Sequence, residues 1–256
     1  MLDRLVKDTC SDHIIVKTNM EIANLHAQNL DFEKAEFVLK ELAEEYSQTR
    51  QGQEAMMRLL ELYWQMNQKD KAIDFLFYLI IANPNPETRR QAFHRVMNFE
   101  EGIIAEIEAR GKLLELKSGL RRKINQAKHP SETVYTLRFL TKIASWTEDW
   151  DQVVFANTRL VEDFHDLQIK LQSYQSLAKA YREKGDFERA TIYLQRIIEL
   201  APNGIMIPGT LLRLAHFQLE QGTKDNHTYK VLRQLAEKYP GTGEGQEASE
   251  LLEQLE

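Results

Sequence analysis

Hydrophobic residues recur along the chain at helical spacing, in paired segments that short polar turns separate. The clearest pair covers residues 171–204. Tyr174, Leu177 and Tyr181 lie three or four positions apart there, which is the spacing of side chains on one face of a helix. Gly185 follows this stripe, and glycine readily adopts the left-handed conformation that ends a helix. The pattern predicts two amphipathic helices joined by a tight turn.

Two nearly identical pentapeptides indicate that this pattern is an internal repeat. They are Asp31–Ala35 and Asp186–Ala190, and each lies where one predicted helix ends and the next begins. Aspartate can cap the new helix, and alanine allows two helices to approach closely. The pentapeptides start 155 positions apart, which equals four periods of 37 residues and an insertion of seven.

The same periodicity divides most of the chain into six predicted repeats and a final helix. The repeats cover residues 16–49, 53–86, 90–126, 134–167, 171–204 and 208–241. The unit at 90–126 is degenerate because it lacks the turn motif. We therefore expect residues 103–128 to form one long helix, with the insertion around 127–133. Residues 246–255 are predicted to cap the exposed end of the stack. The chain is thus predicted to be a single all-α domain, residues 1–256, with at least twelve helices.

The unit at 171–204 resembles the tetratricopeptide repeat (TPR) at nearly every signature position, from its aromatic residues to Gly185 and Pro202. The resemblance implies a right-handed superhelical solenoid of antiparallel helix pairs. The period of 37 residues is slightly longer than the ~34 residues of the common repeat. In addition, the short segments Glu44–Ser47 and Glu237–Thr242 resemble sequences between the repeats of bacterial envelope proteins. Examples of such proteins are the outer-membrane assembly lipoprotein and the coordinator of the Tol-Pal system.

The charge balance and the cysteine content disfavour some classes of function. The chain has 33 basic and 39 acidic residues, so its mildly negative charge disfavours binding to nucleic-acid phosphates. Its single cysteine, Cys10, excludes an internal disulfide and favours a reducing compartment. No apolar stretch approaches the ~18 residues of a membrane span, and the first residues lack a signal-peptide core. We therefore expect a cytoplasmic protein, with a periplasmic location as the alternative if a signal sequence was removed.

Residues that could carry chemistry do not form a recognisable catalytic or metal site. Cys10 and His13 form a Cys-x-x-His pair, but no second ligand pair follows at zinc spacing. The glycine-rich segment Gly241–Gly245 has no preceding strand and no following Gly-Lys-Ser/Thr, both of which a phosphate-binding loop requires. We find no nucleophile with an adjacent base. The sequence predicts a protein that is not an enzyme and that holds neither a metal nor a cofactor.

The predicted binding surface follows from the TPR resemblance, which implies that the first helix of each pair lines a concave groove. The predicted partner-binding residues are Tyr135, Arg138, Lys142, Trp146, Gln175, Lys179 and Arg182, with Asn24 and Trp64 in earlier repeats. The first seven form a basic, aromatic patch that we expect to bind an acidic peptide segment. The alternative is that Trp146 packs under the next turn and that the cations are ordinary solvated residues.

Two classes of function remain open. The first is an interaction scaffold or adaptor that holds a peptide or helix of a partner protein in the groove. The second is a structural part of a larger multiprotein assembly, such as one in the cell envelope. Binding of chaperone C-termini is not predicted, because the carboxylate clamp needs a set of Lys, Asn and Arg residues of which only Asn24 is present, with Met20 in place of the preceding Lys.

Overall fold

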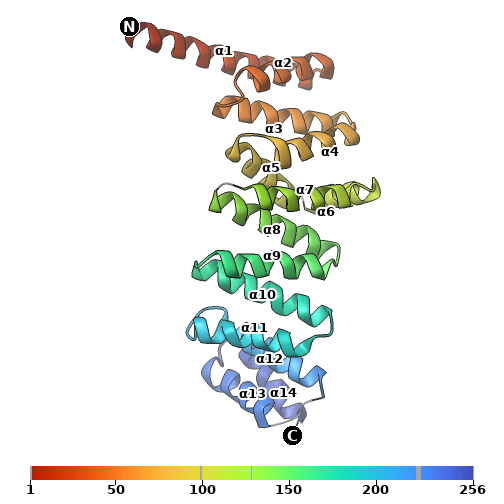
Figure 1. Ribbon diagram of the computed structural model, residues 1–256, viewed down its shortest axis with the longest axis vertical. Coiled ribbons are helices and arrows are strands. Elements are labelled where there is room, and N and C mark those ends of the chain that lie inside the picture. The colour runs from red at the N-terminus through yellow and green to blue at the C-terminus, as the bar shows by residue number, and fades with distance from the viewer. Residues whose placement is uncertain (1, 99, 128, 223–225, 256) are drawn as a thin grey trace. The chain divides into compact units, whose positions relative to one another are not determined.

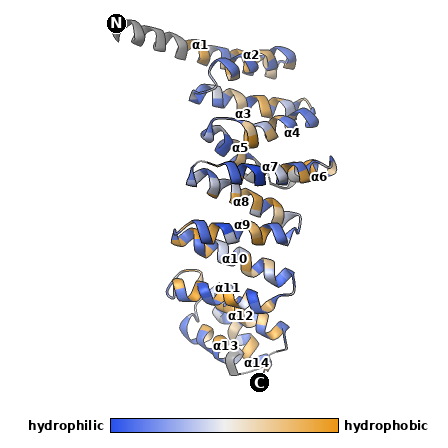
Figure 2. Cartoon of the chain, in the orientation of Figure 1, coloured by the Kyte–Doolittle hydropathy of each residue, from blue (hydrophilic) through white to orange (hydrophobic). Residues whose placement is uncertain are grey.

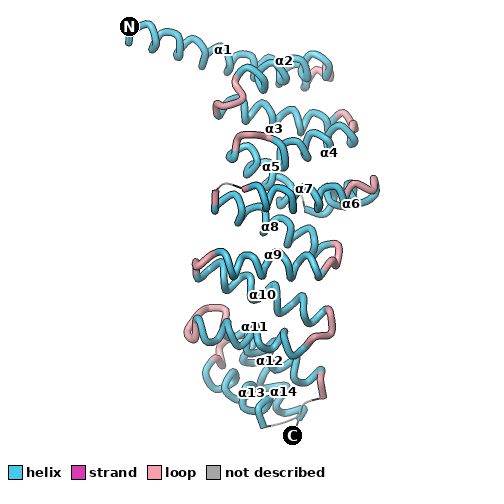
Figure 3. The backbone as a smooth tube through the Cα atoms, viewed as in Figure 1, coloured by secondary structure: helices cyan, strands magenta, loops and turns pink. Residues whose placement is uncertain are grey.

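The computed structural model describes residues 2–98, 100–127, 129–222 and 226–255, and the regular elements of these residues are all helices (Figures 1 and 3). Fourteen α-helices are found in the described part of the chain, which confirms the predicted all-α class with antiparallel helix pairs. The chain divides into two compact units, Met1–Gln126 and Ala127–Glu256. That the repeats form one continuous solenoid over 1–256 stays a prediction.

The first unit contains seven α-helices and one π-helical turn. These are α1 (Leu2–Gln28), α2 (Phe32–Glu45), α3 (Arg50–Gln65), α4 (Lys69–Phe77), the π-helix η1 (Tyr78–Ala82), α5 (Pro86–Asn98), α6 (Glu100–Ala109) and α7 (Leu113–Gln126). Each helix packs mainly on its neighbours in the sequence. Their contact faces are apolar, with Ala35, Leu39, Leu59 and Leu76 among the buried side chains.

The second unit contains the other seven helices. These are α8 (Pro130–Trp146), α9 (Trp150–Asp163), α10 (Leu167–Glu183), α11 (Phe187–Leu200), α12 (Ile207–Glu220), α13 (Asn226–Lys238) and α14 (Gly243–Leu255). One core joins α10 to α14 through buried residues such as Leu177, Leu194, Leu214, Leu232 and Ala248. Hydrophobic and hydrophilic residues mix along the helices, as amphipathic helices require (Figure 2).

The turn inside each helix pair contains one residue in the left-handed conformation. In the described part of the chain these residues are Leu30, Asn67, Gly111, Glu148, Gly185 and Gly222, with φ between 52° and 76°. In the turn after α10, the amide of Asp186 donates a hydrogen bond to the carbonyl oxygen of Tyr181 at 2.8 Å. The amide of Gly185 donates one to the carbonyl oxygen of Arg182, also at 2.8 Å. These bonds satisfy carbonyl groups that the helix end leaves free.

The spacing of the left-handed residues shows where the repeat is interrupted. It is 37 residues from Leu30 to Asn67 and 37 residues at each step from Gly111 onward, but 44 residues from Asn67 to Gly111. The seven extra residues therefore precede Gly111, in the part of the chain that contains α5. The predicted insertion around 127–133 is wrong. The predicted long helix over 103–128 is also wrong, because Gly111 turns the chain between α6 and α7.

A second kind of turn precedes α3 and α14. The Thr49 hydroxyl donates to the carbonyl of the tyrosine three residues earlier at 2.9 Å and accepts from the amide of Gly52 at 3.1 Å. Thr242 and Gly245 make the same two contacts before α14. A Cβ atom on either glycine would lie 2.0 Å from the tyrosine carbonyl oxygen, so only glycine fits. The predicted terminal helix over 246–255 lies within α14, which begins with the turn of a new repeat.

Candidate functional site

The second unit has a cleft of about 380 Å³ on the side formed by its first helices. Side chains of α10 and α12 provide most of its walls, with Ser145 of α8 and Leu194 of α11. Gln175, Lys179 and Arg182 line the cleft from α10. Their spacing of four and three residues places them on one face of that helix.

The α10 arginine in this wall already has acidic partners. The Arg182 guanidinium donates to both carboxylate oxygens of Glu220 on α12, at 2.6 and 3.2 Å, and lies 3.6 Å from Glu183. The hydrogen bond from Arg182 lowers the pKa of the Glu220 carboxyl group. The same guanidinium lies 5.6 Å from the ring centroid of Phe217. Much of the positive charge of Arg182 is therefore balanced.

Two other cations of the cleft are not balanced in this way. Lys179 on α10 and Arg213 on α12 both line the cleft and are exposed. Within the residues that the structure describes, neither side chain forms an ion pair. The Lys179 ammonium lies 5.6 Å from the ring centroid of Trp150, a cation–π contact that leaves its charge uncompensated. The apolar part of the cleft comes from Ala178, Leu194 and Phe217.

The predicted residues of α8 do not line this cleft. Arg138 donates to the side-chain carbonyl of Gln172 at 2.8 Å and so links α8 to α10. Tyr135 and Lys142 are half-buried, and the Trp146 side chain is 41% exposed. These four residues lie on the first helix of the neighbouring repeat, as the period predicts. Three of the seven residues of the predicted patch are thus brought together at the cleft.

Asn24 and Trp64 belong to the first unit. Asn24 lines a separate cleft of about 370 Å³ together with Arg58 and Glu61, and its side-chain oxygen accepts from Arg58 at 2.9 Å. Trp64 is half-buried on α3, and its indole Nε1 has no hydrogen-bond partner among the described residues. Neither residue contributes to the cleft of the second unit.

Sequence reasoning missed Arg213 and Phe217. Of their neighbours on α12, Leu212 packs against the core and His216 hydrogen-bonds with Glu247 at 2.9 Å. The sequence contained a sign of the role of Arg213, because the 37-residue period aligns it with Ser176, which also lines the cleft.

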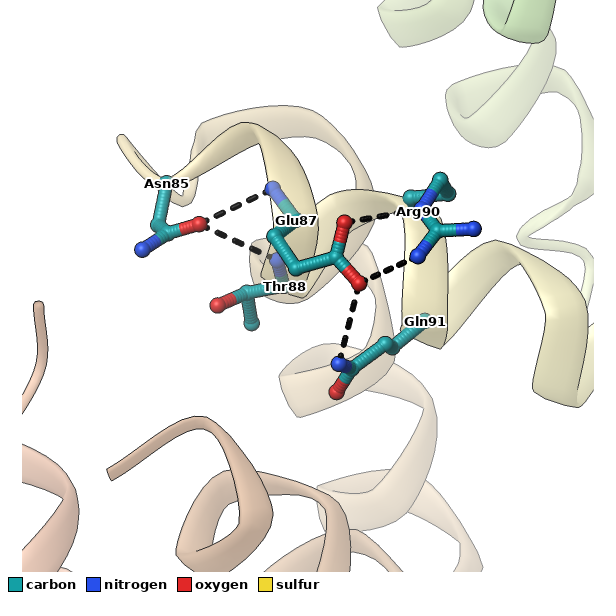
Figure 4. Close-up of polar contacts among 5 residues, drawn as sticks. All are labelled: Asn85, Glu87, Thr88, Arg90 and Gln91. Carbon is teal, nitrogen blue, oxygen red and sulfur yellow. Dashed lines mark hydrogen bonds and ion pairs between the residues drawn. The ribbon is translucent and has the colours of Figure 1, made fainter. Parts of the chain in front are cut away.

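A polar cluster in the first unit has a structural explanation (Figure 4). Asn85 accepts hydrogen bonds from the amides of Glu87 and Thr88, at 2.9 and 3.2 Å, and so caps the start of α5. The Glu87 carboxylate accepts from Arg90 at 2.8 Å and from Gln91 at 3.2 Å. The hydrogen bond from Arg90 lowers the pKa of Glu87. These contacts fix the start of α5 and give the cluster a structural role.

Other candidate chemistry is sparse in the described part of the chain. Its residues contain no group of three or more His, Cys, Asp or Glu side chains placed to hold a metal ion. The side chains of Cys10 and His13 lie outside the described residues. None of the described helices is both long enough and apolar enough to cross a membrane.

Comparison with known proteins gives one family and several similar folds. Residues 171–203 match the tetratricopeptide repeat family. The crystal structure of PilW, a widely conserved type IV pilus biogenesis factor, is 13% identical, with 91% of this chain and 97% of that chain covered and a TM-score of 0.50. The apo form of RapI is 12% identical over 92% of this chain and 79% of that chain, with a TM-score of 0.45.

A tetratricopeptide repeat protein from Parabacteroides merdae is 11% identical, with 94% of this chain and 98% of that chain covered and a TM-score of 0.38. No curated protein matches the sequence. At these identities, the likeness to PilW shows a shared fold and no shared function.

Proposed function

Because the chain is a tetratricopeptide-repeat protein, we propose that it is a protein-interaction scaffold that holds an acidic segment of a partner protein in the cleft of its second unit. The fold supports a role in protein binding in general. The observation that carries the finer proposal is the cleft itself, in which Lys179 and Arg213 form no ion pair with the described residues while apolar side chains lie beside them.

The chemistry of the cleft favours a carboxylate next to a hydrophobic residue. Lys179 and Arg213 would donate charge-assisted hydrogen bonds to a carboxylate of the partner, and such bonds are stronger than neutral ones. Phe217 and Leu194 offer an apolar surface to a neighbouring side chain. The ion pair between Arg182 and Glu220 holds the guanidinium over Phe217 and so shapes the wall.

The residues of α8 would extend this site along the groove. Trp146 is partly exposed, and Tyr135, Arg138 and Lys142 lie on the same helix. Trp, Tyr and Arg are the residue types that most often dominate the free energy of protein association. A partner segment longer than a few residues would therefore run from α12 across α10 to α8. In this proposal the protein has no catalytic role, as is typical of its family.

Charge reversal at the cleft tests this proposal. The probe is a fluorescein-labelled peptide of alternating Glu and Leu, with a Lys–Leu peptide as its counterpart, and binding is followed by fluorescence anisotropy. We expect the Glu–Leu peptide to bind and the Lys–Leu peptide not to bind. The double variant Lys179→Glu/Arg213→Glu should raise the dissociation constant at least about tenfold, and added salt should weaken binding to the unmodified protein.

The matched control reverses two cations on a second helix of the same unit, Lys230→Glu/Arg233→Glu on α13. Within the described residues neither cation forms an ion pair, so the control changes the net charge equally. If the control weakens binding as much as the cleft variant, or if neither changes it, the cleft is not the binding site.

The second candidate function, a structural subunit of a larger assembly, is favoured by a different observation, the exposed apolar face of α1.

A further inference from the structure

The arginine in the wall of the second-unit cleft is already bound to a carboxylate, that of Glu220. The two oxygen atoms of this carboxylate accept hydrogen bonds from Nε and Nη2 of Arg182, at 3.2 and 2.6 Å. Arginine binds the carboxylates of ligands through the same two-point contact, because the planar guanidinium matches a carboxylate in shape. Glu220 therefore occupies the edge of Arg182 that a carboxylate of a partner protein would use.

Arg182 and Glu220 differ in their position relative to the cleft. Arg182 of α10 lines the cleft, whereas Glu220 of α12 is not one of its lining residues. The guanidinium also lies 5.6 Å from the ring centroid of Phe217, which is part of the cleft wall. Arg182 thus keeps a cation–π contact in the cleft that does not depend on Glu220.

The ion pair between these two side chains is open to solvent. The Arg182 side chain is 41% exposed and the Glu220 side chain is 38% exposed. Exposed ion pairs contribute little to stability, because water already solvates both charges when they are apart. Within the described residues, Arg182 is the one hydrogen-bond donor to the Glu220 side chain. A second carboxylate can therefore replace Glu220 at small cost.

A second glutamate near Arg182 does not compete in this way. Glu183 lies 3.6 Å from Nη1 of Arg182, which is beyond hydrogen-bond distance. It therefore offsets part of the charge of Arg182 but does not occupy Nε or Nη2. Of the two carboxylates, Glu220 is the one that holds the two-point binding edge.

We propose that Glu220 is an internal competitor for the cleft: it holds Arg182 in the free protein, and a carboxylate of the bound segment displaces it. Because this role concerns the same cleft, it rests on the proposed function. Displacement exchanges the two hydrogen bonds between Arg182 and Glu220 for two equivalent ones to the partner, and Glu220 becomes solvated. Arg182 is thus a third carboxylate-binding residue, beside Lys179 and Arg213.

Three cations in one cleft favour a partner segment with at least two acidic residues. Lys179 and Arg213 form no ion pair with the described residues, so a first carboxylate binds them without competition. A second carboxylate is needed to displace Glu220 from Arg182, which follows Lys179 by about one helical turn on α10. A segment with a single acidic residue leaves the internal ion pair in place. Glu220 therefore makes the cleft selective for the number of acidic residues.

A double-mutant cycle tests the proposal, with the fluorescein-labelled Glu–Leu peptide as the probe and fluorescence anisotropy as the readout. Glu220→Gln should lower the dissociation constant at least about threefold, because it releases Arg182 for the peptide. Arg182→Gln should raise the dissociation constant at least about threefold more in the Glu220→Gln background than in the unmodified protein. A Gln–Leu peptide with one Glu should gain less from Glu220→Gln than the Glu–Leu peptide does.

The matched control is Glu237→Gln on α13, which removes the same charge from an exposed glutamate and should leave the dissociation constant unchanged. Within the described residues Glu237 forms no ion pair. Circular dichroism checks that each variant keeps its helix content.

The outcomes separate this role of Glu220 from the proposed function. If the unmodified protein binds the Glu–Leu peptide but Glu220→Gln binds it no more tightly than the control, the competition is overturned and the proposed function stands. Equal losses from Arg182→Gln in both backgrounds would also overturn it, because Glu220 would then act through its charge alone. Equal gains for both peptides would overturn the selectivity for two acidic residues. If none of the proteins binds the peptide, the proposed function fails and the competition fails with it.

Discussion

At the scale of single residues, the turn inside each helix pair demands a left-handed backbone, and this chain provides it in two ways. Glycine occupies the left-handed position at Gly111, Gly185 and Gly222 without steric cost. Leu30 and Glu148 occupy it with side chains that disfavour this conformation. Gly185 could be recognised from the sequence because glycine is the usual residue there. Leu30 and Glu148 could not, because their type gives no sign of a positive φ.

This difference predicts that Glu148→Gly stabilises the protein. The substitution removes the strain of a left-handed Glu and should raise the free energy of unfolding by about 1 kcal/mol. The reverse change, Gly185→Glu, should lower it by a similar amount. Urea denaturation followed by circular dichroism measures both. A loss of stability in Glu148→Gly would show that the Glu148 side chain makes a contact worth more than the strain.

At the scale of helices, the sequence predicted the helix pairs well but misplaced the seven-residue insertion that interrupts the repeat. The stripes at 171–204 match α10 and α11, because glycine and a capping aspartate mark that turn. The region around Gly111 was misassigned because this chain also has glycines inside helices, at Gly102 in α6 and Gly119 in α7. Composition alone does not distinguish a glycine that turns the chain from one that the helix tolerates.

The turns before α3 and α14 predict opposite effects for two glycine substitutions. Gly52→Ala should lower the free energy of unfolding by about 1–3 kcal/mol or more, because its Cβ would lie 2.0 Å from a backbone oxygen. Gly102→Ala is the matched control, since nothing lies within 4 Å of its added Cβ. It should be neutral or stabilise α6 by about 0.5–1 kcal/mol. Thermal melting compares the two, and equal melting temperatures would refute the close approach at Gly52.

At the scale of the whole molecule, the 37-residue period predicted part of the lining of the candidate site. It did not predict which of the charged residues there form ion pairs. Gln175, Lys179 and Arg182 line the cleft as the register predicted. The pairing of Arg182 with Glu220 depends on the distance between two helices that are 38 residues apart in the sequence, and a helical period does not specify that distance. The candidate site is therefore smaller than the predicted patch, and within the described part of the chain Lys179 and Arg213 are its cations without an ion pair.

Site-specific photo-crosslinking in cells tests the central claim, that the cleft of the second unit contacts an acidic segment of a partner protein. A benzophenone amino acid replaces Ser176 in the cleft, and the same amino acid replaces Ile192 on α11 as the control. We expect crosslinked adducts from position 176, with Asp and Glu enriched in the crosslinked partner peptide identified by mass spectrometry. Adducts of equal yield from position 192, or none from position 176, would contradict it.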